Sequence, residues 1–79
     1  MSTVRAVVEV LARALTDKPE QVQVIESQHK GTTLVELFVA PGELGKVIGK
    51  QGRTARSLRL ALGASASRVG RKANLEIAD

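Results

Sequence analysis

The sequence has no cysteine, tryptophan or tyrosine, a single phenylalanine, Phe38, and a single histidine, His29. Without cysteine, the chain forms no disulfide framework, no thiolate metal site and no cysteine nucleophile. One histidine does not assemble a multi-histidine metal site, so we expect no metal and no cofactor. With one aromatic side chain, the stacking platforms of RRM, OB-fold and cold-shock modules are also excluded.

Long apolar runs are absent as well. None approaches the roughly 18–20 residues that span a bilayer, so no membrane insertion is expected. Arg5, Glu9 and Arg13 interrupt the apolar N-terminal region, which therefore does not match the core of a signal peptide, and we expect a cytoplasmic location. The chain has 79 residues, of which 43% are hydrophobic and 25% charged. This length and balance predict one small globular domain over residues 1–79.

Acidic residues are absent from one continuous stretch, residues 46–72. Elsewhere acidic residues outnumber basic ones, although the whole chain has a formal charge of +4. A solvated helix face normally mixes the two signs of charge, because opposite charges four residues apart support a helix. We therefore favour an anionic partner over a merely soluble surface. The basic residues of the stretch are Lys46, Lys50, Arg53, Arg56, Arg59, Arg68, Arg71 and Lys72.

Hydrophobic periodicity predicts two long helices, over residues 3–15 and 53–69. Gly70 is placed to serve as the C-terminal glycine of the second helix. A helix that ends at Gly63, followed by a polar loop over 64–70, is the alternative. The apolar stripes comprise Val4, Val7, Val8, Leu11 and Leu15 in the first helix, and Ala55, Leu58, Leu62, Ala66 and Val69 in the second.

Alternating patterns predict strands over residues 21–26, 32–39 and 72–77, with a turn at Lys30-Gly31 and a short helix over 43–48. The second strand is apolar on nearly both faces, which is typical of a central strand. The last strand follows a helical crossover and should lie parallel to it. The predicted fold class is α+β, a three-stranded mixed sheet with helices on one face. Leu34 and Phe38 lie on the opposite face.

The joint between the short and the long helix contains Gly49 and Gly52, three residues apart. Glycines allow a sugar-phosphate backbone to approach closely, and the start of the long helix attracts anions. Lys46, Lys50 and Arg53 flank the glycines, and two apolar residues, Val47 and Ile48, offer a wall for bases. Alternatively, the glycines merely end one helix and start the next. The spacing does not match the P-loop of nucleotide hydrolases.

The segment Val47-Ile48-Gly49-Lys50-Gln51-Gly52-Arg53 resembles the signature of the KH domain. The element order is similar to the type II KH arrangement, and the whole chain is similar to the small single-domain bacterial KH proteins of the KhpA (YlqC) type. The resemblance implies that Gly49, Lys50, Gln51 and Gly52 clamp the backbone of about four nucleotides of single-stranded RNA. It also implies that such proteins self-associate as a homodimer, or form a heteromer with a KhpB (Jag)-type RNA-binding protein.

The remaining site residues follow from the same resemblance. Lys46, Arg53 and Arg56 would reinforce the clamp, and Val47, Ile48 and the strand around Ala73–Leu75 would line a groove for bases. Arg68, Arg71 and Lys72 would form its far, basic rim. The sequence thus predicts a non-enzymatic RNA-binding protein that acts as an RNA chaperone or post-transcriptional regulator.

An assembly or adaptor subunit, for which RNA binding is secondary, is the alternative function. Its partner surface would be the sheet face with Leu34 and Phe38. An enzyme is disfavoured, because Glu43 and Glu76, the acids nearest the basic stretch, have no catalytic partner suggested by the sequence. We interpret His29 as a solvated turn residue.

Overall fold

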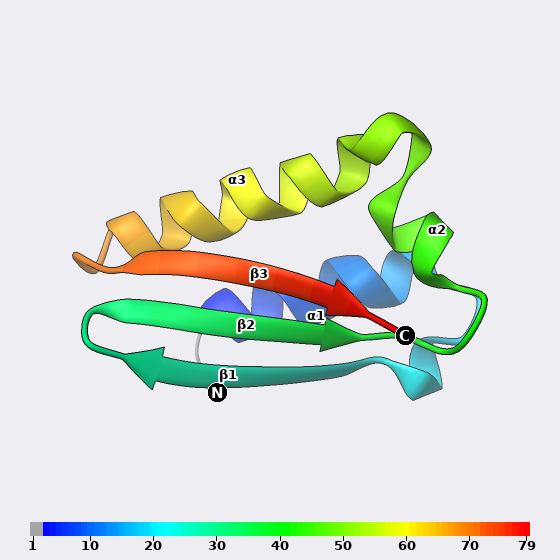
Figure 1. Cartoon of the computed structure of the whole chain (residues 1–79), viewed down its shortest axis with the longest axis horizontal. Coiled ribbons are helices and arrows are strands. Elements are labelled where there is room, and N and C mark those ends of the chain that lie inside the picture. The colour runs from blue at the N-terminus through cyan, green and yellow to red at the C-terminus, as the bar shows by residue number, and fades with distance from the viewer. Residues whose placement is uncertain (1–2) are drawn as a thin grey trace.

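Five helical segments and three strands make up the protein in a computed structural model, which describes residues 3–79 and their side chains from Arg5 onward. The helical segments are three α-helices, α1, α2 and α3, and two single-turn 3-10 helices, η1 and η2 (Figure 1). Their order along the chain is α1 (Thr3–Leu15), η1 (Pro19–Gln21), β1 (Gln23–His29), β2 (Thr32–Phe38), α2 (Leu44–Ile48), η2 (Lys50–Gly52), α3 (Arg53–Ser67) and β3 (Lys72–Ala78).

The strands form one sheet in the order β1-β2-β3. β1 and β2 are an antiparallel hairpin, and β3 lies parallel to β2. The structure confirms the predicted α+β arrangement, with the most apolar strand at the centre. The largest difference in strand bounds concerns the first strand, because β1 continues to His29, where the alternation of apolar residues has already ended.

Both long helices cover the same face of the sheet. In Figure 1, α1 lies behind the strands and α3 runs along β3. The fully buried side chains of β2, Val35 and Leu37, point to this face, while Leu34, Glu36 and Phe38 alternate with them and are half-buried. The core therefore lies between the sheet and the two helices.

The predicted stripe of α1 is partly wrong. Val8 and Ala12 are fully buried, whereas Leu11 and Leu15 remain 40% and 38% exposed. The side chain of Val4, also in that stripe, lies outside the described residues. The helix packs on the sheet through Val8 and Ala12, so that Leu11 and Leu15 face sideways toward α3, and they line a groove between the two helices.

The second long helix continues past Gly63, as predicted, and ends two residues earlier than the apolar stripe indicated. Its end is a Schellman motif: the Gly70 N–H donates to the Ser67 carbonyl (3.1 Å) and the Arg71 N–H to the Ala66 carbonyl (2.9 Å). Gly70 is thus the C-terminal glycine. Because the chain turns away there, Val69 is 70% exposed and does not join the core.

Candidate nucleic-acid interface

The segment between α2 and α3 is a tight loop built on two glycines. Gly49 adopts φ 78° and ψ 171°, and Gly52 adopts φ 73° and ψ 13°. A Cβ atom at Gly49 would lie 2.2 Å from the Thr54 hydroxyl oxygen, whereas a Cβ at Gly52 would meet no atom within 4 Å. Gly49 is therefore required by its own backbone and by the packing of Thr54, and Gly52 by its backbone alone.

Gln51, between these glycines, also has a left-handed backbone, with φ 57° and ψ 25°. A non-glycine residue in this conformation costs about 1–2 kcal/mol, and such strain concentrates at functional sites. The Gln51 side chain is exposed, and its amide oxygen accepts a hydrogen bond of 3.4 Å from the Arg53 guanidinium. The loop thus holds a polar side chain outward beside a cation.

The long helix α3 begins directly after this loop, and no side chain caps its N-terminus. The first N–H groups of a helix lack partners within the helix, and they carry the positive end of its dipole. In the loop and first turn, Lys50, Arg53 and Arg56 are exposed, and no ion pair between described residues involves them. The loop therefore combines backbone donors with three available positive charges.

Lys46 differs from these cations, because its ammonium group is paired with two carboxylates. It forms ion pairs with Asp17 and with Glu43, the latter at 3.1 Å. These bonds raise the pKa of Lys46 above its ordinary value. Lys46, which was predicted to reinforce the phosphate clamp, is thus bound to acidic side chains rather than presented to solvent alone.

Glu43 is the buried partner in this cluster. Its carboxylate accepts hydrogen bonds from the Thr16 hydroxyl (2.6 Å) and the Asp17 backbone N–H (2.7 Å). These two bonds, followed by the bond from Lys46, lower the pKa of Glu43 from 4.5 to about 2. Sequence reasoning missed this role, because the partners lie far away in the chain and no spacing indicates them.

The apolar residues before the loop separate into two environments. Val47 is fully buried and belongs to the core, whereas Ile48 is half-buried next to the loop. The prediction that Val47 forms a wall for bases is therefore wrong. In a helix of one and a half turns, only one of two consecutive side chains can face the groove.

The three predicted rim residues also differ from one another. Arg68 and Lys72 are exposed at the opposite end of α3 from the loop (Figure 1). The Arg71 guanidinium instead donates to the Thr33 hydroxyl (2.9 Å) and the Thr32 carbonyl (3.0 Å). It therefore braces the start of β2, and two of its donors are not available to a ligand at the rim.

Within residues 3–79, no strand pairs with the outer edge of β3, beside α3. Lys72 donates its N–H to Gly31 and Ala78 accepts from Val39, so these residues direct their backbone groups toward the β2 side. Backbone groups alternate along a strand, and those of Ala73, Leu75 and Ile77 therefore point to the free edge. They offer a row of donors and acceptors for an extended ligand.

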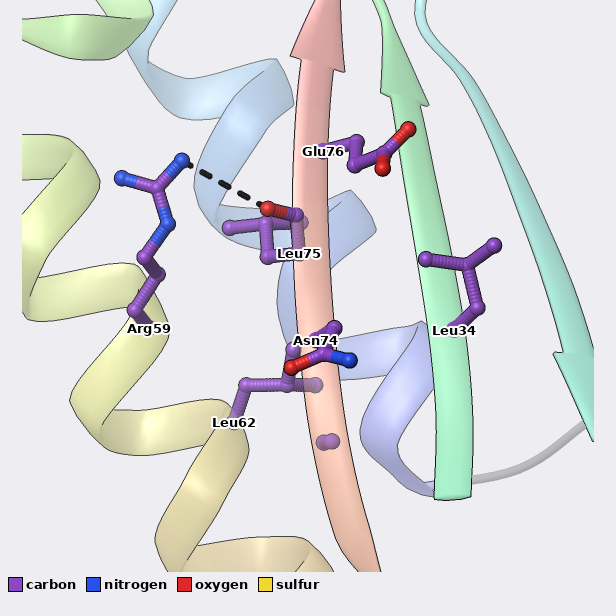
Figure 2. A pocket seen from close by; sticks show the side chains of 7 residues that line it. Leu34, Arg59, Leu62, Asn74, Leu75 and Glu76 are labelled. Carbon is purple, nitrogen blue, oxygen red and sulfur yellow. Dashed lines mark hydrogen bonds between the residues drawn. The ribbon is translucent and has the colours of Figure 1, made fainter. Parts of the chain in front are cut away.

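A hollow of about 270 Å³ lies over this edge (Figure 2). The Arg59 guanidinium reaches across it and donates to the Leu75 carbonyl at 3.5 Å. Arg59 was not among the predicted site residues. Its position on α3 is the signal that could have identified Arg59 as a site residue. It lies three residues after Arg56 and one after the buried Leu58, and therefore faces the sheet edge. The lining residues are Leu34, Arg59, Leu62, Ala73, Asn74, Leu75 and Glu76.

A second, apolar groove of about 360 Å³ separates α1 from α3. It adjoins the exposed Val10, which is 67% exposed. The sheet face that we expected to carry a partner surface is less exposed, because Leu34 and Phe38 are half-buried. The lining residues of the groove are Leu11, Ala14, Leu15, Thr54, Ser57, Leu58 and Ala61.

Residues 3–79 contain neither a membrane-spanning helix nor a cluster of metal ligands. No helix there is both long and apolar enough to cross a membrane. The described histidine and acidic side chains form no group of three or more that could hold a metal ion. The candidate binding surfaces are thus two: the loop together with the β3 edge, and the groove between α1 and α3.

Comparison with known proteins agrees with this geometry. A chain in the crystal structure of Era, in complex with MgGDPNP and nucleotides 1506–1542 of 16S ribosomal RNA, superposes with a TM-score of 0.65 at 20% identity. The match covers 95% of the present chain and 29% of the Era chain. This similarity confirms the fold, a type II KH arrangement.

Sequence relatives are closer. The RNA-binding protein KhpA of Aquifex aeolicus is 47% identical over 98% of both chains. KhpA of Clostridium perfringens is 42% identical over 92% of this chain and 97% of its own length. KhpA of Treponema pallidum is 48% identical over 87% of this chain and 86% of its own length. The profile of the family described as "KhpA/KhpB, KH domain" matches residues 5–77. The chain therefore belongs to the KhpA/KhpB family of KH domains.

Proposed function

We propose that this protein binds single-stranded RNA without catalysing a reaction, and that it serves as an RNA chaperone or post-transcriptional regulator in the cytoplasm. The observation that carries the proposal is the loop from Gly49 to Gly52, in which left-handed backbone, an uncapped helix start and unpaired cations meet. The relatives named RNA-binding protein KhpA support the ligand class.

At the loop, the ligand is the phosphate backbone. Gly52, beside which there is open space, leaves room for a phosphate, and the exposed Lys50 and Gln51 side chains donate hydrogen bonds to phosphate oxygens. Arg53 and Arg56 extend the positive charge along the first turns of α3. Since phosphate contacts carry no sequence information, this part of the site sets affinity and register.

The bases lie over the free edge of β3. Arg59 flanks the edge, and the backbone of Ala73 and Leu75 offers hydrogen-bond donors and acceptors there. Ile48, half-buried next to the loop, adds an apolar contact. No aromatic stacking is involved, because the single aromatic residue, Phe38, does not line the hollow over this edge. A base reaches this edge only when its pairing edge is free, which selects single strands over duplexes. Exposed cations at the far end of α3, Arg68 and Lys72, guide the departing strand.

Backbone amide shifts during titration with a single-stranded RNA 8-mer test this assignment. We expect the largest changes at residues 48–53 and 73–77, and much smaller ones with a duplex of the same length. Shifts confined to the outer sheet face, around Ile25 and Glu36, would contradict the proposed site and favour the assembly-subunit alternative.

Self-association is the second part of the proposal. Val10, Leu11 and Leu15 are exposed next to the apolar groove between α1 and α3. Apolar side chains that gather around a groove are typical of a protein–protein surface. A second copy of this chain is the proposed occupant, and a KhpB (Jag)-type protein would use the same surface. One end of this surface adjoins the RNA loop, because Thr54 lines the groove and packs against Gly49.

Sedimentation velocity at concentrations from about 1 to 100 μM tests this part. A dimer that Leu15→Glu dissociates, and that Ile25→Glu on the sheet face leaves intact, supports the groove. Dissociation by Ile25→Glu alone would move the interface to the sheet, and a parent protein that is monomeric at all concentrations would contradict self-association.

A further inference from the structure

We infer that Lys46 is a positioning residue for the glycine loop and makes no contact with RNA phosphate. The inference rests on the proposed function. It concerns the only basic residue near the loop whose described ion pairs join it to acidic side chains. The positive charge that RNA meets at the loop would then come from Lys50, Arg53 and Arg56.

The cluster around Lys46 is anionic in sum. Asp17 and Glu43 bring two negative charges, and Lys46 brings one positive charge. A phosphate that approached Lys46 would meet this net negative charge. It would also have to compete with two carboxylates already in place, one of them held by the Thr16 hydroxyl and the Asp17 backbone N–H. Electrostatics therefore directs the RNA away from this side of the loop.

The same cluster fixes the helix that leads into the loop. Glu43 immediately precedes α2, and Lys46 lies within it. Both bind the residues that follow α1, while Val47, in the same short helix, is anchored in the core. Gly49 follows one residue after the end of α2. Because α2 has only five residues, a rotation at its attachment to α1 would displace the phosphate-binding backbone directly.

Salt dependence separates a positioning residue from a phosphate ligand. For single strands, each neutralised phosphate contributes about −0.7 to the slope of log affinity against log salt. A residue that contacts phosphate changes this slope when its charge is removed. When the charge of a residue that only positions the loop is removed, the affinity falls and the slope stays unchanged.

The test is titration of a single-stranded RNA 8-mer at five salt concentrations, with four variants. Lys46→Met removes the charge in question, and Lys46→Arg restores it. Lys50→Met removes the charge of a proposed ligand, and Lys18→Met removes that of an exposed lysine next to the cluster as a matched control. Circular dichroism at the titration temperature ensures that each variant is folded, and the amide shifts of Gly49 and Gly52 report the loop position.

We expect Lys46→Met to weaken binding by roughly threefold to tenfold at an unchanged slope, to shift the Gly49 and Gly52 amides, and to be rescued by Lys46→Arg. Lys50→Met should flatten the slope by about 0.7, and Lys18→Met should bind as the parent does. Should Lys46→Met be poorly folded, Glu43→Gln with Lys46→Met removes the uncompensated buried charge and should give the same slope.

A slope flattened by about 0.7 in Lys46→Met, alongside the same change in Lys50→Met, would overturn the inference and make Lys46 a phosphate ligand. Binding by Lys46→Met with the affinity and slope of the parent would overturn it as well. If Lys50→Met left both affinity and slope unchanged, the proposed function of the loop would fail, and the inference with it.

Discussion

The Thr16 hydroxyl donates a hydrogen bond of 2.6 Å to the carboxylate of Glu43, which lies 27 residues later in the chain. This bond joins the end of α1 to the residue that precedes α2. Glu43 is buried, and its carboxylate is compensated by two hydrogen bonds and an ion pair. The attachment of the glycine loop to the rest of the fold therefore depends on one ionised side chain.

The stability contributed by Glu43 should depend on pH. Its pKa is lowered from 4.5 to about 2 in the folded protein, so the ionised carboxylate stabilises the fold above pH 4.5, and this contribution is lost as the pH falls toward 2. Urea unfolding of the parent and of Glu43→Gln should differ by a constant amount between pH 5.5 and 7, and the difference should shrink below about pH 4.5. A difference that is the same at pH 3 and pH 7 would show that the charge of Glu43 has no part in it.

The glycines of the loop region should respond in a definite order to substitution by alanine. Gly49→Ala meets both a left-handed backbone and the Thr54 side chain, and should lower the free energy of unfolding by about 2–4 kcal/mol. Gly52→Ala meets open space and should cost about 1 kcal/mol. Gly45→Ala, within α2 and exposed, should stabilise by about 0.5 kcal/mol. Chemical denaturation measures all three, and equal stability of Gly49→Ala and Gly45→Ala would refute the described loop geometry.

Much of the fold was predictable, because local patterns carry it. The two-sided apolar run placed β2 at the centre, and the crossover rule placed β3 parallel to it. The position of Gly70 identified the end of α3 better than the apolar stripe did, since backbone conformation decides where a helix stops. These features depend on residues close together in the sequence.

The errors concern side chains whose partners are distant. A basic residue near the loop looks like an RNA ligand whether or not a carboxylate faces it. Arg71 pairs with Thr33, 38 residues away, and Lys46 pairs with Asp17, 29 residues away. Likewise, Val47 and Ile48 are equally apolar in the sequence, and only the packing of α2 determines which one is buried.

Two neighbouring leucines of α3 test the described core. Leu58 is 2% exposed and Leu60 is 70% exposed. Leu58→Ala should lower the free energy of unfolding by about 2–5 kcal/mol, because it leaves a cavity between the sheet and the helices. Leu60→Ala, on the same helix, should change it by no more than about 0.5 kcal/mol. Thermal or urea unfolding compares the two variants. Similar losses of unfolding free energy in both would mean that α3 does not direct Leu58 into the core and Leu60 toward solvent.

Arg71 and Arg68 provide a second matched pair. Arg71→Gln removes two hydrogen bonds to the start of β2, and should destabilise the protein by about 1 kcal/mol, since the site is partly exposed. Arg68→Gln removes an exposed charge and should have almost no effect on stability. In RNA titrations the order should reverse, with Arg68→Gln weakening binding more. If Arg68→Gln lowered stability more than Arg71→Gln, and Arg71→Gln weakened RNA binding more than Arg68→Gln, Arg71 would belong to the interface.

The central claim, that the loop binds RNA phosphates, is tested most directly by the double variant Lys50→Asp with Gln51→Asp. Both side chains are exposed, and acidic residues are favoured near a helix N-terminus, so the variant should fold as the parent does by circular dichroism. If Lys50, Arg53, Arg56 and Arg68 neutralise three to four phosphates, the parent should bind single-stranded RNA with a salt slope of about −2 to −3. The variant should lose most of its affinity, with a slope flatter by about one. A folded variant that binds RNA as tightly as the parent, with an unchanged slope, would contradict the account.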